Sequence, residues 1–270
     1  MKIYMTVDME GATGICCREQ TMKGNPYYAE GRRLLTGDVN AAIEGALEGG
    51  ATEILVADAH NGSFNFLLEE LHPAAQVIHG THGGPRFPYL DHSVGAMFIV
   101  AYHARAGTLA ATLEHTMSSA SWFRLTVNGR EIGEVGIDAA LAGAAGVPVV
   151  LVTGDDKVCA EAKELLGAIE TAVVKQGLGR HRAKCLLPKE SHARIREAAR
   201  RAVGRKDQIQ LLSFGSPVEV VLTYKHTEHA DAARGPAACL EFERLDGYTV
   251  RYKFRHLADW YGGVWREREE

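Results

Sequence analysis

The sequence predicts an α/β protein, with a mostly parallel sheet and flanking helices, followed by a smaller C-terminal α+β domain. Two observations support this prediction. Short apolar runs, typical of strands buried on both faces, alternate along the chain with segments of helical periodicity. Near residue 188 the pattern changes, and short strands and short helices follow one another. We therefore expect an α/β domain over residues 1–188 and a smaller α+β domain over residues 189–270.

The elements of the first domain follow from periodicity. Four apolar runs that end in polar residues are the expected strands, at Lys2–Val7, Glu53–Ala57, Ala96–Tyr102 and Val147–Thr153. Apolar residues at near-helical spacing predict helices over Tyr28–Glu48, Phe64–Leu71, Asp138–Ala145 and Asp156–Leu166. The dipeptide Asn128-Gly129 supplies the positive φ angles of a type I′ turn, so it predicts a β-hairpin of Trp122–Val127 and Arg130–Ile132.

The C-terminal part mixes both kinds of element. We expect a helix over Lys189–Val203, a strand over Val218–Tyr224, a short helix around His229–Ala233, strands around Cys239–Arg244 and Thr249–Phe254, and a last helix. The stretch Gln176–Pro188 is basic and contains two glycines, so we interpret it as a linker.

Composition excludes several classes of function. The 30 basic and 34 acidic residues give a net charge of −4, which argues against a nucleic-acid partner. No apolar run approaches the ~18 residues that a membrane span needs, and the first residues do not resemble a signal peptide. The five cysteines are odd in number and form no CxxC motif, which indicates reduced thiols and a cytoplasmic protein. The unusual feature is the number of histidines, which is 12.

Polar side chains follow three of the expected strands. Asp8-x-Glu10 follows the first, Asp58-x-His60 the second, and His103 another. Ligands of an open parallel sheet bind at the carboxyl ends of its strands, and residues i and i+2 of an extended chain point to the same side. Carboxylates and imidazoles that converge there suit Zn²⁺ or Mn²⁺. Each residue alone is more often a cap or a solvated turn residue, but three strand ends together favour a metal site.

Other residues extend this set. Glu114-His115 lies about twelve residues after His103, and Glu134 is flanked by Gly133 and by Val135-Gly136 just before an expected helix. A glycine there lets a ligand approach the backbone closely. His79 and His82 either add ligands or belong to a loop over the site.

Six short motifs occur in order along the chain, at Val7–Gly11, Asp58–His60, Tyr102–Ala106, Glu114–Met117, Gly133–Gly136 and Gly154–Asp156. Each motif alone is a weak signal, but the ordered set is specific. Together they resemble the D-aminopeptidases of peptidase family M55, the bacterial dipeptide-operon type. The resemblance spans roughly residues 1–190 and, more loosely, the rest of the chain.

The resemblance implies a zinc-dependent aminopeptidase with two Zn²⁺ ions per subunit, for which Mn²⁺ or Co²⁺ could substitute. Its metal ligands would be Asp8, which bridges the ions, with Glu10, His60, His103 and Glu134. His115 would be the catalytic residue. Substrates would be short peptides with an N-terminal D-residue, such as D-Ala-D-Ala. The family is also described as forming ring-shaped homo-oligomers, so we expect rings, with a decamer as the candidate size.

The expected chemistry agrees with these residues. Two bridged metals would lower the pKa of a shared water and hold a hydroxide at neutral pH. His115 could donate a proton to the leaving amine or stabilise the oxyanion. Asp58 is expected to orient a ligand imidazole. Glu114 stands where the family has a small polar residue, and it is a candidate partner for the amino group of the substrate.

Two rival interpretations stay open. The first is another di-metal amidohydrolase that acts on a cell-wall-derived or non-peptide amide. The second is a non-catalytic, ring-forming peptide-binding protein whose metal is structural. A substrate panel separates the first rival from the peptidase. The second would be favoured if the metals were four-coordinate with protein atoms only.

Overall fold

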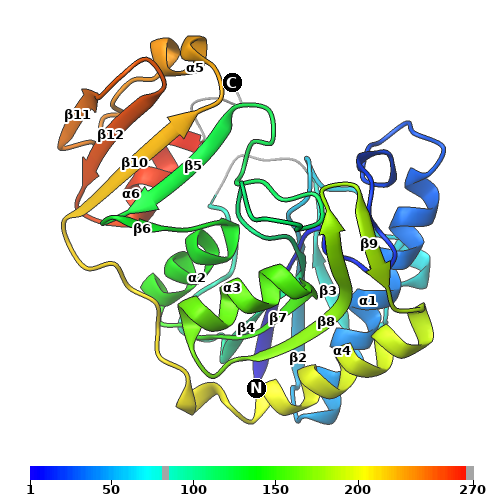
Figure 1. Cartoon of the computed structure of the whole chain (residues 1–270). Helices are drawn as coiled ribbons and strands as arrows, with labels where there is room; N and C mark the ends of the chain where they lie inside the picture. Colours follow the sequence, from blue (N-terminus) through cyan, green and yellow to red (C-terminus); the bar gives the residue numbers. More distant parts are fainter. Residues whose placement is uncertain (81–84, 266–270) are drawn as a thin grey trace.

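A seven-stranded sheet forms the larger part of the fold, in the order β3-β2-β1-β4-β7-β8-β9 (Figure 1). The structure is a computed structural model that describes residues 1–80 and 85–265. The strands of this sheet are β1 (Lys2–Val7), β2 (Glu53–Asp58), β3 (Ala75–Ile78), β4 (Ala96–Tyr102), β7 (Val149–Asp155), β8 (Glu170–Gly179) and β9 (Arg182–Cys185). Neighbours pair in parallel except β8 and β9. The predicted mostly parallel sheet is confirmed.

The strand order reverses between β1 and β4. From β1 the chain passes through α1 (Tyr28–Glu48) and moves outward to β2 and β3; from β4 it moves the other way to β7 and β8. Such a reversal opens a crevice at the carboxyl ends of the two central strands. Asp8 follows β1 and His103 follows β4, so both residues lie at this crevice.

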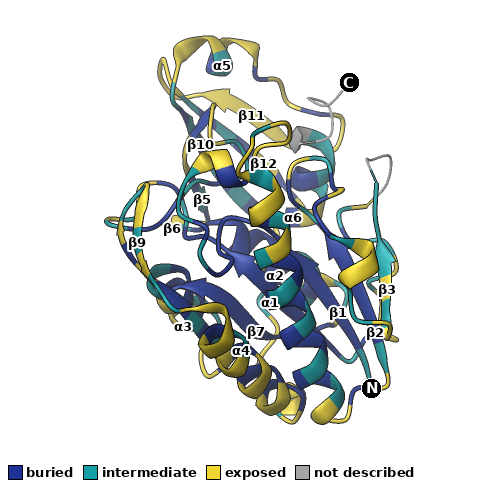
Figure 2. Ribbon diagram, turned by 90° about the vertical axis from the view of Figure 1, so that its right-hand side faces the viewer, coloured by how far each residue is buried: buried dark blue, intermediate teal, exposed yellow. Residues whose placement is uncertain are grey.

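Helices cover both faces of the sheet. On one face α1 packs against α4 (Pro188–Val203), and on the other lie α2 (Glu134–Ala144) and α3 (Asp156–Leu166) (Figure 1). The strands between these layers are almost entirely buried, whereas the outer side of α4 is exposed (Figure 2). Burial on both faces explains why the central strands are continuous apolar runs rather than alternating ones.

A second, antiparallel sheet has the order β11-β12-β10-β5-β6. Its strands are β5 (Trp122–Val127), β6 (Arg130–Glu131), β10 (Val218–Tyr224), β11 (Glu241–Arg244) and β12 (Thr249–Phe254). The short helices α5 (Thr227–Ala232) and α6 (Leu257–Trp260) accompany it, and a π-helical turn, Tyr261–Trp265, follows α6. At the β5–β6 turn, Asn128 and Gly129 have φ angles of 49° and 76°. The predicted hairpin is therefore confirmed.

The two sheets exchange segments across residue 188. The hairpin of β5 and β6 precedes that residue, yet β5 pairs with β10, with Val127 opposite Val220. Conversely, α4 follows residue 187 but packs against α1 and β8 of the first sheet. The sheets therefore do not divide at residue 188, and separate domains over 1–188 and 189–270 stay a prediction.

Helix α2 lies between the two hydrophobic cores. Val135 and Ala139 belong to the core of the first sheet, and Ile137 and Ala140 belong to the core of the second. Glu134, the first residue of α2, is therefore positioned by both sheets.

Two expectations about local structure are wrong. Phe64–Leu71 is not a helix but contains only a 3₁₀ turn, Leu68–Glu70, because Phe64 has a left-handed backbone (φ 68°). Gln176–Pro188 is not a linker but contains the end of β8, the strand β9 and the first residue of α4. β9 is an edge strand with exposed polar side chains, so its composition resembles that of a linker.

Candidate metal centre and active site

Asp8 lies between two histidines that come from different strand ends. Its Oδ1 is 2.9 Å from Nδ1 of His60, and its Oδ2 is 3.2 Å from Nε2 of His103. The backbone N–H of Met9 also donates to Oδ1, at 2.8 Å, which fixes the carboxylate. One carboxylate therefore offers one oxygen to each side of the site, which is the arrangement expected of a bridging ligand.

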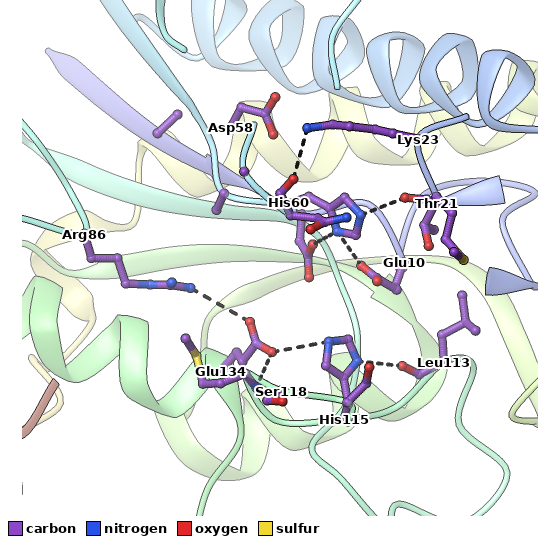
Figure 3. A pocket seen from close by; sticks show the side chains of 18 of the residues that line it. Glu10, Thr21, Lys23, Asp58, His60, Arg86, Leu113, His115, Ser118 and Glu134 are labelled. Atoms are coloured by element: carbon purple, nitrogen blue, oxygen red, sulfur yellow. Dashed lines mark hydrogen bonds and ion pairs between the residues drawn. The ribbon is translucent and has the colours of Figure 1, made fainter. Parts of the chain in front are cut away.

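Two overlapping groups of side chains could hold metal ions. Asp8, Glu10 and His103 form one group; His103, His115 and Glu134 form the other, with the candidate ligand atoms of each group within 4.8 Å of one another. Glu10 Oε2 is 3.1 Å from His60 Nδ1, and Glu134 Oε1 is 3.3 Å from His103 Nε2. The structure thus brings together the five residues that the sequence nominated as ligands, Asp8, Glu10, His60, His103 and Glu134. Figure 3 labels three of them, Glu10, His60 and Glu134.

Each histidine of the site is oriented by a backbone carbonyl group. His60 Nε2 lies 3.1 Å from the oxygen of Thr21, His103 Nδ1 3.0 Å from that of Ala104, and His115 Nδ1 2.9 Å from that of Leu113. Because a carbonyl oxygen only accepts, these ring nitrogens carry the hydrogen. The second nitrogen of each ring is left to face the carboxylates, as in histidine ligands of metals.

The charges of the site favour a bound cation. Burial lowers the pKa of His60, but the carboxylates of Glu10 and Asp8 outweigh burial and raise that pKa well above its usual range. In the same way, the carboxylates of Glu134 and Asp8 raise the pKa of His103 well above its usual range, although burial lowers it. Burial raises the pKa of Asp8 and of Glu134, yet the histidines hold the pKa of Asp8 well below its ordinary value and that of Glu134 at about 2. Ionised carboxylates therefore surround imidazoles that attract either protons or a metal.

Two buried atoms support the metal interpretation. Glu10 Oε2 and His103 Nε2 make no hydrogen bond of acceptable geometry within the described ranges 1–80 and 85–265. Buried polar atoms rarely lack a hydrogen-bond partner. Oxygen and imidazole nitrogen without sulfur form the donor set of catalytic zinc sites. The residues therefore fit a divalent metal ion.

His115 lies at the border of the metal site and the cavity. Its ring stacks on that of His103. Its Nε2 is 3.7 Å from Oε1 of Glu134 (Figure 3). Burial and the neighbouring His103 lower the pKa of His115, so its imidazole is neutral at neutral pH. A neutral ring with hydrogen on Nδ1 presents the lone pair of Nε2 to the cavity, as a proton acceptor would. Its catalytic role stays a prediction.

The two other nominated residues, Asp58 and Glu114, contact residues outside the five nominated ligands. Asp58 accepts hydrogen bonds from the N–H and Nδ2 of Asn65, at 2.7 and 2.8 Å, and Asn65 Nδ2 also donates to the carbonyl oxygen of His60, at 2.7 Å. Asp58 therefore supports the main chain of His60 rather than its imidazole. Glu114 forms an ion pair with Arg180, in which Nη1 and Oε2 are 2.7 Å apart.

Sequence reasoning missed Arg86, which lies beside Glu134 (Figure 3). Its Nη2 is 3.9 Å from Glu134 Oε2, and its Nε and Nη2 donate to the two oxygens of Asp138 at 2.5 and 2.9 Å. Asp138 is fully buried and also accepts from the hydroxyl of Tyr102, at 2.5 Å. A lone arginine in a loop carries no sequence signal of such a role.

The loop after β1, which carries Glu10, is held by Lys175 from β8. This buried ammonium group donates to the carbonyl oxygens of Glu10, Ala12 and Ile15, at 2.6, 2.9 and 2.5 Å. Gly11 brings the loop against β4, because a Cβ at that position would lie 1.9 Å from the carbonyl oxygen of Tyr102. The available signal for Lys175 was a charged residue that directly follows an apolar run.

A cavity of about 1410 Å³ opens over these residues. Besides the metal site its lining includes Arg18, Lys23, Arg86, Arg180 and His181. This volume is enough for a short peptide. His79 also lines the cavity, 3.9 Å from Asp58, whereas His82 lies outside the described residues.

Comparison with known proteins agrees with this site. The chain matches the M55 peptidase family, described as D-aminopeptidase, over residues 1–265. The chain belongs to this family. A D-aminopeptidase of Bacillus subtilis (strain 168) is 35% identical to this M55 peptidase over 233 residues, which cover 86% of the chain and 84% of the relative.

A solved structure extends the likeness to the whole fold. It is described as the Zn-dependent D-aminopeptidase DppA from Bacillus subtilis, a self-compartmentalizing protease. The TM-score is 0.92 at 31% sequence identity, over 100% of this chain and 97% of the other. The protein is therefore a peptidase of a zinc-dependent D-aminopeptidase family, as the sequence motifs indicated. Within its described ranges no helix has the length and apolar character needed to cross a membrane.

Proposed function

We propose that this peptidase releases N-terminal D-amino acids from short peptides such as D-Ala-D-Ala, with two zinc ions per subunit. The observation that carries the proposal is the position of Asp8, with one oxygen toward His60 and the other toward His103. Asp8 would be shared by both ions, with Glu10 and His60 on one side and His103 and Glu134 on the other. The preference for D-residues is supported by the family match.

The residues of the chain transfer the proton and orient the groups that take part in the reaction. Zinc, when bound, polarises a carbonyl group and lowers the pKa of water. His115 accepts at Nε2 the proton that the attacking water loses, and returns it to the leaving amine. The carbonyl group of Leu113 keeps the hydrogen of the neutral ring on Nδ1, so that Nε2 is free for this transfer. Arg86 forms a long ion pair with the carboxylate of Glu134, at 3.9 Å, and helps to orient it.

The proposal is tested by metal analysis together with a paired substrate assay. The purified protein should contain two zinc ions per chain and cleave D-Ala-D-Ala and D-Ala-p-nitroanilide faster than the L-forms. Removal of the metal should abolish cleavage, and zinc, manganese or cobalt should restore it. Protein that stays inactive on all of these after metal is added would refute the proposal. Cleavage of other amides alone would favour a different amidohydrolase.

We also propose that the protein is a cytoplasmic homo-oligomer that forms decameric rings. The similar solved structure is described as self-compartmentalizing, which supports an assembly around an inner chamber. The five cysteines are free thiols, which supports a reducing compartment. Mass photometry of the native protein should give ten times the mass of the 29.3 kDa chain. A monomer at micromolar concentration would contradict the ring.

A further inference from the structure

The loop over residues 110–115, which leads to His115, has an unfavourable backbone. Ala110 and Leu113 have φ angles of 56° and 53°, in the left-handed region that residues with a side chain rarely adopt. Such a conformation persists only where surrounding contacts enforce it, and it recurs at active sites. The position of His115 therefore depends on whatever holds this loop.

Neighbouring elements of the first sheet hold the loop through its N–H groups. Thr112 donates to Oδ2 of Asp155 at the end of β7, at 2.8 Å, and Leu113 donates to the carbonyl oxygen of Arg180, at 2.9 Å. Arg180 belongs to the turn between β8 and β9. Gly177 lets β8 lie directly against the loop, because a Cβ there would be 2.3 Å from the carbonyl oxygen of Ala110.

Arg180 also holds the loop with its side chain. Its Nη1 donates to the carbonyl oxygen of Glu114 and lies 2.7 Å from Oε2 of the same residue. The main chain is thus held at the N–H of Leu113 and at the carbonyl group of Glu114. Between these two points, the carbonyl oxygen of Leu113 accepts the hydrogen bond from Nδ1 of His115. Arg180 therefore fixes the peptide units that orient the imidazole.

We propose that Arg180 is a positioning residue for His115 and that Glu114 is its counter-ion. The inference rests on the proposed function for the role of His115, and it gives Glu114 a task other than binding the amino group of the substrate. The ion pair compensates the charge of the guanidinium group, although Arg180 lines the cavity. Its contribution is then to the rate of the chemical step rather than to the binding of substrate.

The test combines kinetics with a local structural readout. In Arg180→Gln we expect kcat to fall about 10- to 100-fold, because a small displacement of a catalytic group has an effect of that size. KM and the zinc content should stay within twofold of the wild type. Hydrogen exchange over residues 109–117, measured by mass spectrometry, should be at least tenfold faster. Arg182→Gln, on the same hairpin but outside the cavity lining, is the matched control and should change neither readout.

Two further variants separate the parts of the clamp. Arg180→Lys keeps the charge but lacks the forked geometry, so it should recover part of kcat. Glu114→Gln should lower kcat, and combining it with Arg180→Gln should add little, because both changes break one interaction.

Several outcomes would overturn the inference. Unchanged exchange and kcat in Arg180→Gln would show that the clamp is dispensable. A raised KM with unchanged kcat would make Arg180 a substrate-binding residue instead, and loss of zinc would make it a support of the metal site. If the wild type cleaves no D-peptide, the proposed function fails, and the exchange measurement still decides whether Arg180 holds the loop.

Discussion

The imidazole of His115 lies parallel to that of His103, with ring centroids 3.8 Å apart and ring planes 14° apart. His103 directs its Nε2 at Asp8 and Glu134, and His115 directs its Nε2 at Glu134 and the cavity. The stack thus joins a predicted metal ligand to the predicted catalytic residue, and a substitution of His115 tests the division of roles.

His115→Ala should retain two zinc ions per chain and lose about 10²- to 10⁴-fold in kcat, the usual contribution of a general acid–base group. Elemental analysis and D-Ala-p-nitroanilide kinetics measure the two quantities. His92→Ala, which alters an exposed histidine outside the cavity lining, is the control and should retain activity. Loss of zinc from His115→Ala would make His115 a ligand.

Zinc binding should strengthen as pH rises. In the metal-free protein the neighbouring carboxylates raise the pKa of His60 and of His103 well above the usual value, so both rings hold protons at neutral pH. Zinc must displace these protons, so its affinity falls as pH drops below the raised pKa values and levels off above them. Calorimetry in buffers of different ionisation enthalpy should detect the released protons. An affinity independent of pH would contradict this account.

Arg86→Met should lower the free energy of unfolding by about 3–5 kcal/mol, because it leaves the buried carboxylate of Asp138 without its cation. Adding Asp138→Asn should restore part of the loss. Arg194→Met removes an exposed ion pair with Glu190 and should cost less than about 1 kcal/mol. Urea denaturation compares the variants, and equal losses in Arg86→Met and Arg194→Met would contradict the prediction.

Lys175→Met should both destabilise the protein and weaken zinc binding. It removes the ammonium donor from three buried carbonyl groups of the loop after β1. Ala12 still accepts from the N–H of Ile15, so we expect a cost of about 1–3 kcal/mol for each of the other two, Glu10 and Ile15. Since one of them belongs to Glu10, the ligand itself should loosen. Chelator competition and thermal unfolding test this, with the exposed Lys184→Met as control. Wild-type zinc affinity in Lys175→Met would show that the ammonium group serves stability alone.

The sequence predicts those features that depend on continuous patterns. The buried strands β1, β2 and β4 are mostly apolar, and the polar residues at or after their ends converge because parallel strands end at one edge of the sheet. The proximity of Asp8, His60 and His103 could therefore be predicted from the sequence. The prediction of a helix over Phe64–Leu71 is wrong because Phe64 has a left-handed backbone and Asp58 accepts hydrogen bonds from the N–H and side chain of Asn65. This tertiary contact outweighs the local periodicity.

The supporting residues could not be predicted in the same way. Arg86, Lys175 and Arg180 each act through contacts with segments far away in the sequence. A single charged residue forms no periodic pattern from which such a contact could be predicted. The ion pair of Glu114 with Arg180 is another contact that the sequence alone does not indicate. The pairing of β5 with β10 is likewise a non-local event.

That pairing sets an order for assembly during translation. The ribosome releases β1 to β9 before β10, so the first sheet can form while β5 still lacks the strand that lies beside it. Until β10 and β12 are synthesised, the core that Ile137 and Ala140 of α2 enter is incomplete, and Glu134 at the start of that helix lacks part of its support. The nascent chain thus carries Asp8, Glu10, His60 and His103 before β10 and β12 complete the second core, which helps to position Glu134.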